Sequence, residues 1–396
     1  MKVYPRRPPV EWLVCVFLGC ALTVTAFLAV LLVFVLPPSV LGPYAVVVAG
    51  VALVALMLGG ALIVVGVRGW HSKPGVPVTT RWGWLVLTVF LAALVGFTFL
   101  IPRRFQSSPF IAPLHFGMIV LPAFIGLLLI IRLSGKNWIP TVRQLVVSLA
   151  GGAASVLIAL PLELIGFVLI AVLVIGAAMV FPGGQAEVDN LLSTIQLWTV
   201  TPPAGIESIS ALVTSPVVMV SLVLILACMT PIIEELVKTL VMGPMGLWMR
   251  PGMGLSFIWG VSCGLGFAIV EGITNGSLGL TGEGWWIGGV FARLFATLMH
   301  AASSGILGLG WSSLWSRKWW GIPLTYAGAV ILHGLWNLSA LILVYGSLLI
   351  TLSELPGTVP AVIGGGMMLV MVLLVVTSLI VIPLWMKRRV HVRPQV

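Results

Sequence analysis

Three ionisable side chains stand within one apolar stretch, PIIEELVKTL at residues 231–240. On a helix Glu234 and Lys238 face the same way, and Glu235 lies about 100° further round. At bilayer depth an ionisable group costs several kcal/mol unless it is paired or lines a polar cavity. Two adjacent carboxylates in such a setting are not expected to be ionised together, and a carboxyl pair of this kind suits acid–base chemistry that activates water.

Three later apolar stretches also carry polar side chains at helical spacing. Glu271 ends the sequence GFAIVE, Arg293 and His300 are seven residues apart, and His333 and Asn337 are four apart in HGLWN. Each pair therefore lies on one helix face. Polar side chains on successive membrane spans find hydrogen-bond and charge partners most simply when all of these helix faces point into a shared interior. We therefore expect these residues to meet those of 231–240 in one buried polar site.

The chain that must position these residues has the composition of a membrane protein. Hydrophobic residues make up 60% of its 396 residues, and charged residues only 8%. A helix needs about 20 apolar residues to cross a hydrocarbon core of about 30 Å. The sequence therefore predicts an all-α, polytopic membrane helical bundle of about ten transmembrane helices. The expected spans are roughly 11–36, 43–67, 82–101, 109–132, 143–181, 216–242, 254–274, 286–314, 323–346 and 360–385.

The net charge of +10 reflects membrane topology and not a nucleic-acid partner. Sixteen of the 20 Lys and Arg residues fall in segments that a both-ends-inside arrangement places in the cytoplasm, and only Arg103 and Arg104 break the pattern. Cytoplasmic loops of membrane proteins carry this excess of basic residues. We expect a multi-pass protein of the cell membrane with both termini in the cytoplasm and the lipid bilayer as its surroundings.

Polar residues also suggest how the chain is divided. Residues 1–181 form an expected accessory transmembrane bundle, 182–215 an outer loop or interfacial segment, 216–350 the polar-core bundle, and 351–396 a closing helix with a basic tail. The stretch 143–181 is long for one span. Splitting it would invert the topology on one side and place one basic set outside, so a single tilted or kinked helix is predicted.

The motifs together resemble the PrsW family of intramembrane proteases, within the wider group that contains CaaX-prenyl endopeptidases. The resemblance rests on EExxK at Glu234, on GFAIVE, on the segment from Arg293 to His300, and on HGLWN, and it covers about residues 231–340. Four motifs in order on four successive spans are specific. In the family pattern an Asn follows the second-motif Glu directly, whereas here Gly272 follows and the nearest Asn is Asn275.

The resemblance implies hydrolysis of a peptide bond within or near the membrane. Glu234 and Glu235 would activate water, His300 and His333 would bind the polarised carbonyl or the water, and Asn337 would assist. The supporting residues are Glu271, Arg293 and Lys238. The implied substrate is a membrane-bound protein, such as a single-span regulator of the anti-sigma-factor kind.

Other protease chemistries can be compared with the sequence directly. No HExxH zinc motif occurs, Asp189 is the sole aspartate, and no G-x-S-G serine motif is present. The main interpretation requires no cofactor. A zinc site made by Glu234, His300 and His333 stays open, because three protein ligands and a water are the usual arrangement at a catalytic zinc ion.

Two functions outside proteolysis are also considered. A non-catalytic scaffold could keep an ion pair between Lys238 and one carboxylate, but the second carboxylate would then lack a cation. A proton-coupled transporter would use buried Glu and His equally well, but transporters commonly repeat such features in both halves. We rank the protease first, the scaffold second and the transporter third. No role is assigned to Glu163, His71, His115 or His391.

Overall fold

The computed structural model is almost entirely helical wherever it describes the chain. Its single β-bridge among the described residues joins Pro77 and Thr141. The structure describes residues 10–35, 44–70, 76–81, 83–100, 111–200, 212, 214–276, 286–352 and 357–391. Arg103, Arg104 and His71 lie outside these residues, as do the side chains of His115 and His391.

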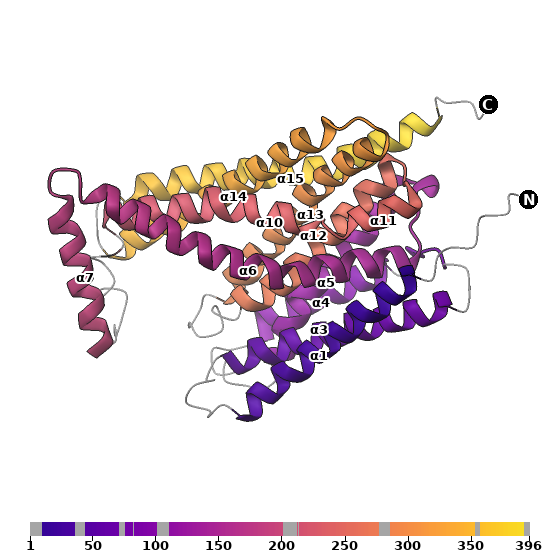
Figure 1. Ribbon diagram of the computed structural model, residues 1–396, viewed down its shortest axis with the longest axis horizontal. Coiled ribbons are helices and arrows are strands. Elements are labelled where there is room, and N and C mark those ends of the chain that lie inside the picture. Colours follow the sequence, from indigo (N-terminus) through magenta and orange to yellow (C-terminus); the bar gives the residue numbers. More distant parts are fainter. Residues whose placement is uncertain are drawn as a thin grey trace, which may run out of the picture. The chain divides into compact units, whose positions relative to one another are not determined.

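The helices follow the expected spans, which confirms the all-α membrane bundle (Figure 1). In the first half they are α1 (Val10–Val35), α3 (Tyr44–Trp70), α4 (Gly83–Leu100), α5 (Ile111–Ser134) and α6 (Val142–Ala178). In the second half they are α9 (Pro216–Leu222) with its continuation, α12 (Met253–Gly276), α13 (Trp286–Trp315), α14 (Gly321–Thr351) and α15 (Thr358–His391). Among the described residues, 8 segments are long and apolar enough to cross a membrane, and parts of α1 and α4 form shorter apolar helices.

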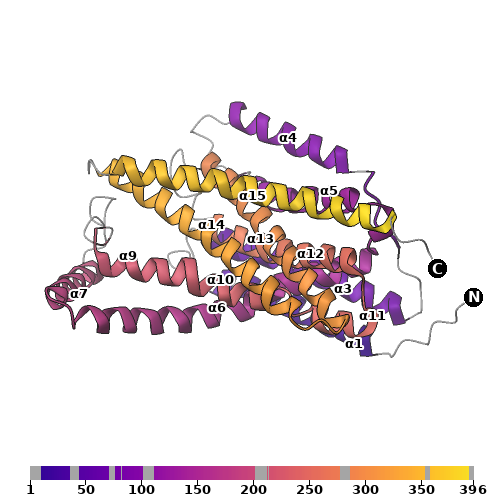
Figure 2. The ribbon, with the colours of Figure 1, turned by 90° about the horizontal axis from the view of Figure 1, so that it is seen from above.

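The stretch expected to form one long helix does so. Helix α6 runs unbroken through 37 residues with Pro161 inside it, and Figure 2 shows it as a single rod. Proline lacks a backbone N–H and disturbs its own turn without ending the helix here. The sequence after α6 contains a further helix, α7 (Gly184–Val200). Whether α7 lies at a membrane surface stays a prediction.

The sixth span changes its helical pitch on the way to the Glu pair. It starts at α9, where the Ser215 side chain caps the helix by accepting from the N–H of Val218 at 3.3 Å. Glu187 of α7 secures this start by accepting from the Ser215 hydroxyl at 2.6 Å. A π-helical segment, η4 (Val223–Met229), follows, and α10 (Thr230–Lys238) then continues the span.

The chain folds into two compact units. The first unit contains Met1–Val156, Val237–Tyr326 and Val376–Val396, and the second contains Leu157–Leu236 and Ala327–Val375. The boundaries fall inside α6, α10 and α15 and near the start of α14, all of which are unbroken helices. The division of the sequence at residues 181, 215 and 350 stays a prediction.

Glycines bring helix backbones close together in the core of the first unit. A Cβ at Gly264 of α12 would collide with the carbonyl oxygen of His300 on α13, and one at Gly260 would collide with that of Ser304. The small-residue stripe of α12 thus lets α13 approach closely, as such stripes do between membrane helices. This approach places the backbone of His300 directly against α12.

Replacing Gly264 by Ala should therefore separate α12 from α13. Overpacking of this kind costs about 1–3 kcal/mol, so we expect Gly264→Ala to lower the melting temperature of the purified protein, followed by tryptophan fluorescence in detergent. Gly289→Ala on α13 is the matched control, because a Cβ there meets no atom within 4 Å. Equal melting temperatures for the two variants would contradict the close approach.

Candidate active site

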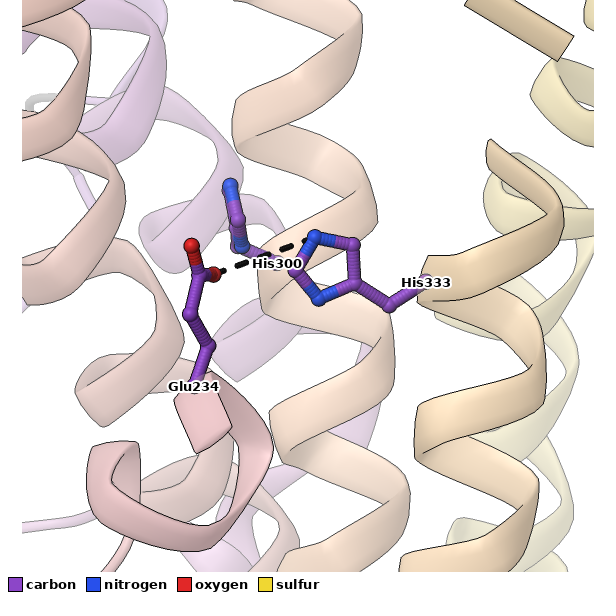
Figure 3. A group of neighbouring side chains, drawn as sticks. All are labelled: Glu234, His300 and His333. Atoms are coloured by element: carbon purple, nitrogen blue, oxygen red, sulfur yellow. Dashed lines mark ion pairs between the residues drawn. The ribbon is translucent and has the colours of Figure 1, made fainter. Parts of the chain in front are cut away.

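The second unit holds one of the two buried polar clusters that bring the expected site residues together in the described part of the chain. In this cluster, called the Glu235 cluster, His333 of α14 lies between two carboxylates of α10. Its Nδ1 is 3.0 Å from Oε1 of Glu235. Its Nε2 is 3.8 Å from Oε2 of Glu234, and Figure 3 draws this second contact as a dashed line. All three side chains are buried. An ionised carboxylate only accepts hydrogen bonds, so when Glu235 is ionised Nδ1–H of His333 donates to it, and Nε2 of the ring faces Glu234.

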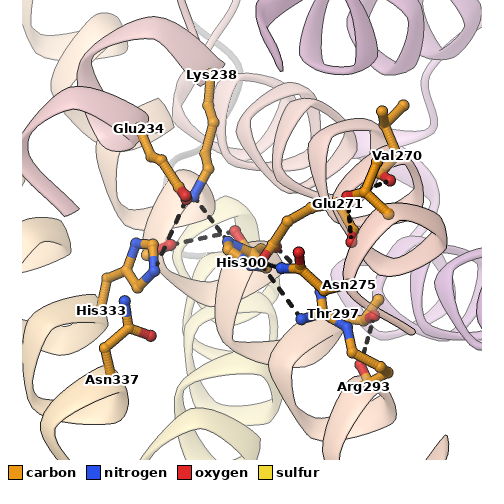
Figure 4. A network of polar contacts seen from close by, with 12 residues as sticks. Glu234, Lys238, Val270, Glu271, Asn275, Arg293, Thr297, His300, His333 and Asn337 are labelled. Carbon is orange, nitrogen blue, oxygen red and sulfur yellow. Dashed lines mark hydrogen bonds and ion pairs between the residues drawn. The ribbon is translucent and has the colours of Figure 1, made fainter. Parts of the chain in front are cut away.

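Asn337 lies one turn after His333 on α14 and contacts the span that carries the Glu pair. Its Nδ2 donates to the backbone carbonyl oxygen of Leu226 in η4 at 2.8 Å. Asn337 and His333 lie on the same side of α14 (Figure 4). The Asn side chain expected to assist the chemistry therefore binds the span that carries the Glu pair.

The first unit holds the other cluster, called the Glu271 cluster. Two guanidinium nitrogens of Arg293 donate to the two carboxylate oxygens of Glu271, at 3.3 and 3.0 Å (Figure 4). The Glu271 carboxylate also accepts from Nδ2 of Asn275 at 2.9 Å and lies 2.6 Å from Nε2 of His300. Glu271 thus joins α12 to α13 through several charge-assisted contacts, which are stronger than neutral ones.

Lys238 approaches the opposite nitrogen of His300. Its Nζ is 2.7 Å from Nδ1 of the ring and 4.4 Å from the centre of the Phe267 ring. An ammonium group has donors and no acceptor, so it donates to Nδ1, and Nε2–H of His300 then donates to Glu271. The aromatic face adds a cation–π contact. Lys238 and His300 are both buried.

Two partners in the Glu271 cluster were not predicted as site residues. Asn275 follows Glu271 by one helical turn, so it supplies an amide to this carboxylate although Gly272 occupies the position where the family pattern has Asn. A side chain at Gly272 would clash with Ile119, since a Cβ there would lie 2.7 Å from its Cγ2. The four-residue spacing of Glu271 and Asn275 was the available signal. Nothing in the sequence pointed to Phe267.

The available donor atoms fit a metal ion. Glu234 and His333 of the second unit and His300 of the first are all buried, and one carboxylate and two imidazoles are the donor types found at several catalytic zinc sites. Each imidazole also contacts a carboxylate through its other nitrogen, Glu271 for His300 and Glu235 for His333. Such carboxylate–histidine pairs orient histidines that bind metals. His300 would exchange its contact with Lys238 for the ion.

Comparison with known proteins agrees with the motifs. The model of a family described as PrsW family intramembrane metalloprotease matches residues 142–380, more than half of the chain. The match begins at the first residue of α6, ends within α15 and includes both polar clusters. No curated protein and no solved structure matches the chain. The chain belongs to the PrsW family of intramembrane metalloproteases.

Proposed function

We propose that the Glu235 cluster and the Glu271 cluster together form the active site of a metal-dependent intramembrane protease. The observation that carries this proposal is the pair of buried carboxylate–histidine contacts, each of which orients one imidazole ring. Helix α10 supports joining the clusters, because it is unbroken and contributes to both. Glu235 and Lys238 are separated by less than one helical turn, a rise of about 4.5 Å.

The chemistry follows from the orientation of each side chain. Glu235 orients the His333 ring through Nδ1, and Glu234 lies beside the other ring nitrogen, Nε2. A water molecule held there would transfer a proton to the Glu234 carboxylate as its oxygen attacks the peptide carbonyl. Glu234 would then pass this proton to the amide nitrogen as the C–N bond breaks and the amine leaves. A metal ion held by Glu234, His300 and His333 would polarise that carbonyl and make the water more acidic.

The remaining roles assist these residues. Glu271 fixes the ring of His300, and Arg293 neutralises and orients Glu271 through two hydrogen bonds. Lys238 supplies positive charge close to the carboxylates on the same helix. A glutamic protease that needs no metal would use the same carboxyl pair. The family description and the donor set favour the metal-dependent alternative.

The substrate and the location of the protein are part of the proposal. Eight apolar helices support a multi-pass membrane protein, and the distribution of basic residues favours the cell membrane with both termini in the cytoplasm. We infer a membrane-bound protein substrate, such as a single-span regulator of the anti-sigma-factor kind. Family membership favours proteolysis over a scaffold or a transporter.

Loss of the carboxyl pair should leave the substrate uncleaved. In the double variant Glu234→Gln/Glu235→Gln the side chains keep their size but cannot act as carboxylate bases, so we expect a membrane protein to accumulate at full length. Quantitative membrane proteomics of cells with and without the substitutions is the measurement. Glu163→Gln on α6 is the matched control, an intramembrane Glu with no assigned role. An unchanged membrane proteome in the double variant would refute the proposed protease.

Metal removal separates the two protease mechanisms. We expect a zinc chelator to stop cleavage of that accumulating protein by the purified enzyme in detergent, and added Zn²⁺ to restore it. The reason is that Glu234, His300 and His333 would lose the ion that polarises the carbonyl. Cleavage that continues at the original rate after chelation would instead assign the chemistry to the Glu pair alone.

Lys238 should compete with a metal ion for His300. Its ammonium group donates to the Nδ1 lone pair, which a metal ligand must offer to the ion. We therefore expect Lys238→Met, which keeps much of the side-chain volume beside Phe267, to bind Zn²⁺ more tightly in isothermal titration calorimetry. Lys136→Met, at an exposed position between α5 and α6, is the control. Weaker zinc binding by Lys238→Met would show that the ammonium does not compete.

A further inference from the structure

One backbone carbonyl just before the Glu pair lacks both of its helical donors. In η4 the N–H of Thr230 donates to the carbonyl of Ile225, five residues earlier. It is therefore diverted from Leu226, its partner in an α-helix. In the π-helical pattern the donor to Leu226 would be residue 231, which is a proline and has no N–H. A carbonyl within a membrane span requires a donor from elsewhere in such a case.

Helix α14 supplies that donor. Nδ2 of Asn337 donates to the Leu226 oxygen at 2.8 Å. One turn earlier, Gly334 lets α14 approach the same segment, since a Cβ there would lie 2.5 Å from the carbonyl oxygen of Ala227. His333, on the same face of α14, contacts Glu235. A single face of α14 thus binds both the irregular backbone and the carboxylate that follows it.

The irregular backbone determines where the Glu pair points. A π-helical turn accommodates an additional residue, and each residue of a helix advances by about 100°. If Thr230 returned its N–H to Leu226, the regular helix would turn the side chains that follow by about that angle. Glu235 would then face away from His333. The Asn337 amide engages the same oxygen that the regular helix would use.

We propose that Asn337 is a positioning residue, whose amide holds the Leu226 carbonyl and so keeps η4 in the π-helical form that directs Glu234 and Glu235 at His333. Its role in catalysis rests on the proposed protease function. The role differs from that of a donor to the substrate carbonyl, the assistance that Asn337 would otherwise give. The chain offers a way to separate the two roles at Pro231.

Pro231→Ala provides the missing donor from within the helix. The new N–H at position 231 can bond the Leu226 carbonyl in the π-helical pattern, so it can replace the amide removed by Asn337→Ala. The test compares four proteins: the wild type, Asn337→Ala, Pro231→Ala and the double variant. Melting temperature in detergent reports on the helix, and the cleavage rate of the membrane protein that accumulates in the Glu234→Gln/Glu235→Gln cells reports on the site.

We expect Asn337→Ala to melt several degrees lower and to cleave about tenfold more slowly or worse, since small misplacements of reacting groups are costly. The double variant should recover both the melting temperature and the cleavage rate. Pro231→Ala alone is the control that measures the effect of replacing the proline. A substrate donor could not be replaced in this way. A lowered melting temperature with an unchanged cleavage rate in Asn337→Ala would overturn the positioning role. A double variant no better than Asn337→Ala in either property would overturn the carbonyl contact as well.

The melting comparison needs no substrate, so it stays informative if the protease function fails. Without a cleaved protein, recovery of the melting temperature would still support the contact between Asn337 and Leu226, whereas the absence of recovery would refute it. Asn337→Ala with an unchanged melting temperature would also refute the inference, because a carbonyl within a span that loses its assigned donor must destabilise the helix.

Discussion

The cost of placing ionisable groups among apolar helices governs the centre of this protein. Removing a charge from water is tolerated only when hydrogen bonds and an opposite charge replace the lost hydration. In the first unit Glu271 is met by Arg293, Asn275 and His300, and Lys238 adds a further positive charge. The second unit gathers two carboxyl groups around one imidazole ring.

The helices can satisfy these groups because their backbones come very close. Gly264 and Gly260 remove the side chains that would hold α12 and α13 apart, and Gly334 does the same for α14 against the sixth span. In lipid, helices gain little from hydrophobic association, and close van der Waals packing takes its place. The same packing that holds the helices together therefore sets the distances among the polar side chains.

Much of this architecture could be predicted from the sequence because its determinants are local. The length of the apolar runs predicted the spans. The distribution of basic residues predicted that 143–181 forms one helix, and the spacing of Glu234 and Lys238 predicted that they face the same way on theirs. Other features depend on what a neighbouring helix presents. The tautomer of His300 follows from Lys238 on one side and Glu271 on the other. The π-helical segment became interpretable only once Asn337 was seen to contact Leu226.

Pro231 also affects the order in which the site can form during synthesis of the chain. The sixth span cannot complete its own hydrogen bonding, and the amide that completes it lies 111 residues further along the chain. During synthesis the Glu pair therefore enters the membrane well before α14 is available. The carboxyl groups would take up their working orientation only after that later helix is inserted. The protease would therefore have no activity while it is being synthesised, until α14 has been inserted into the membrane.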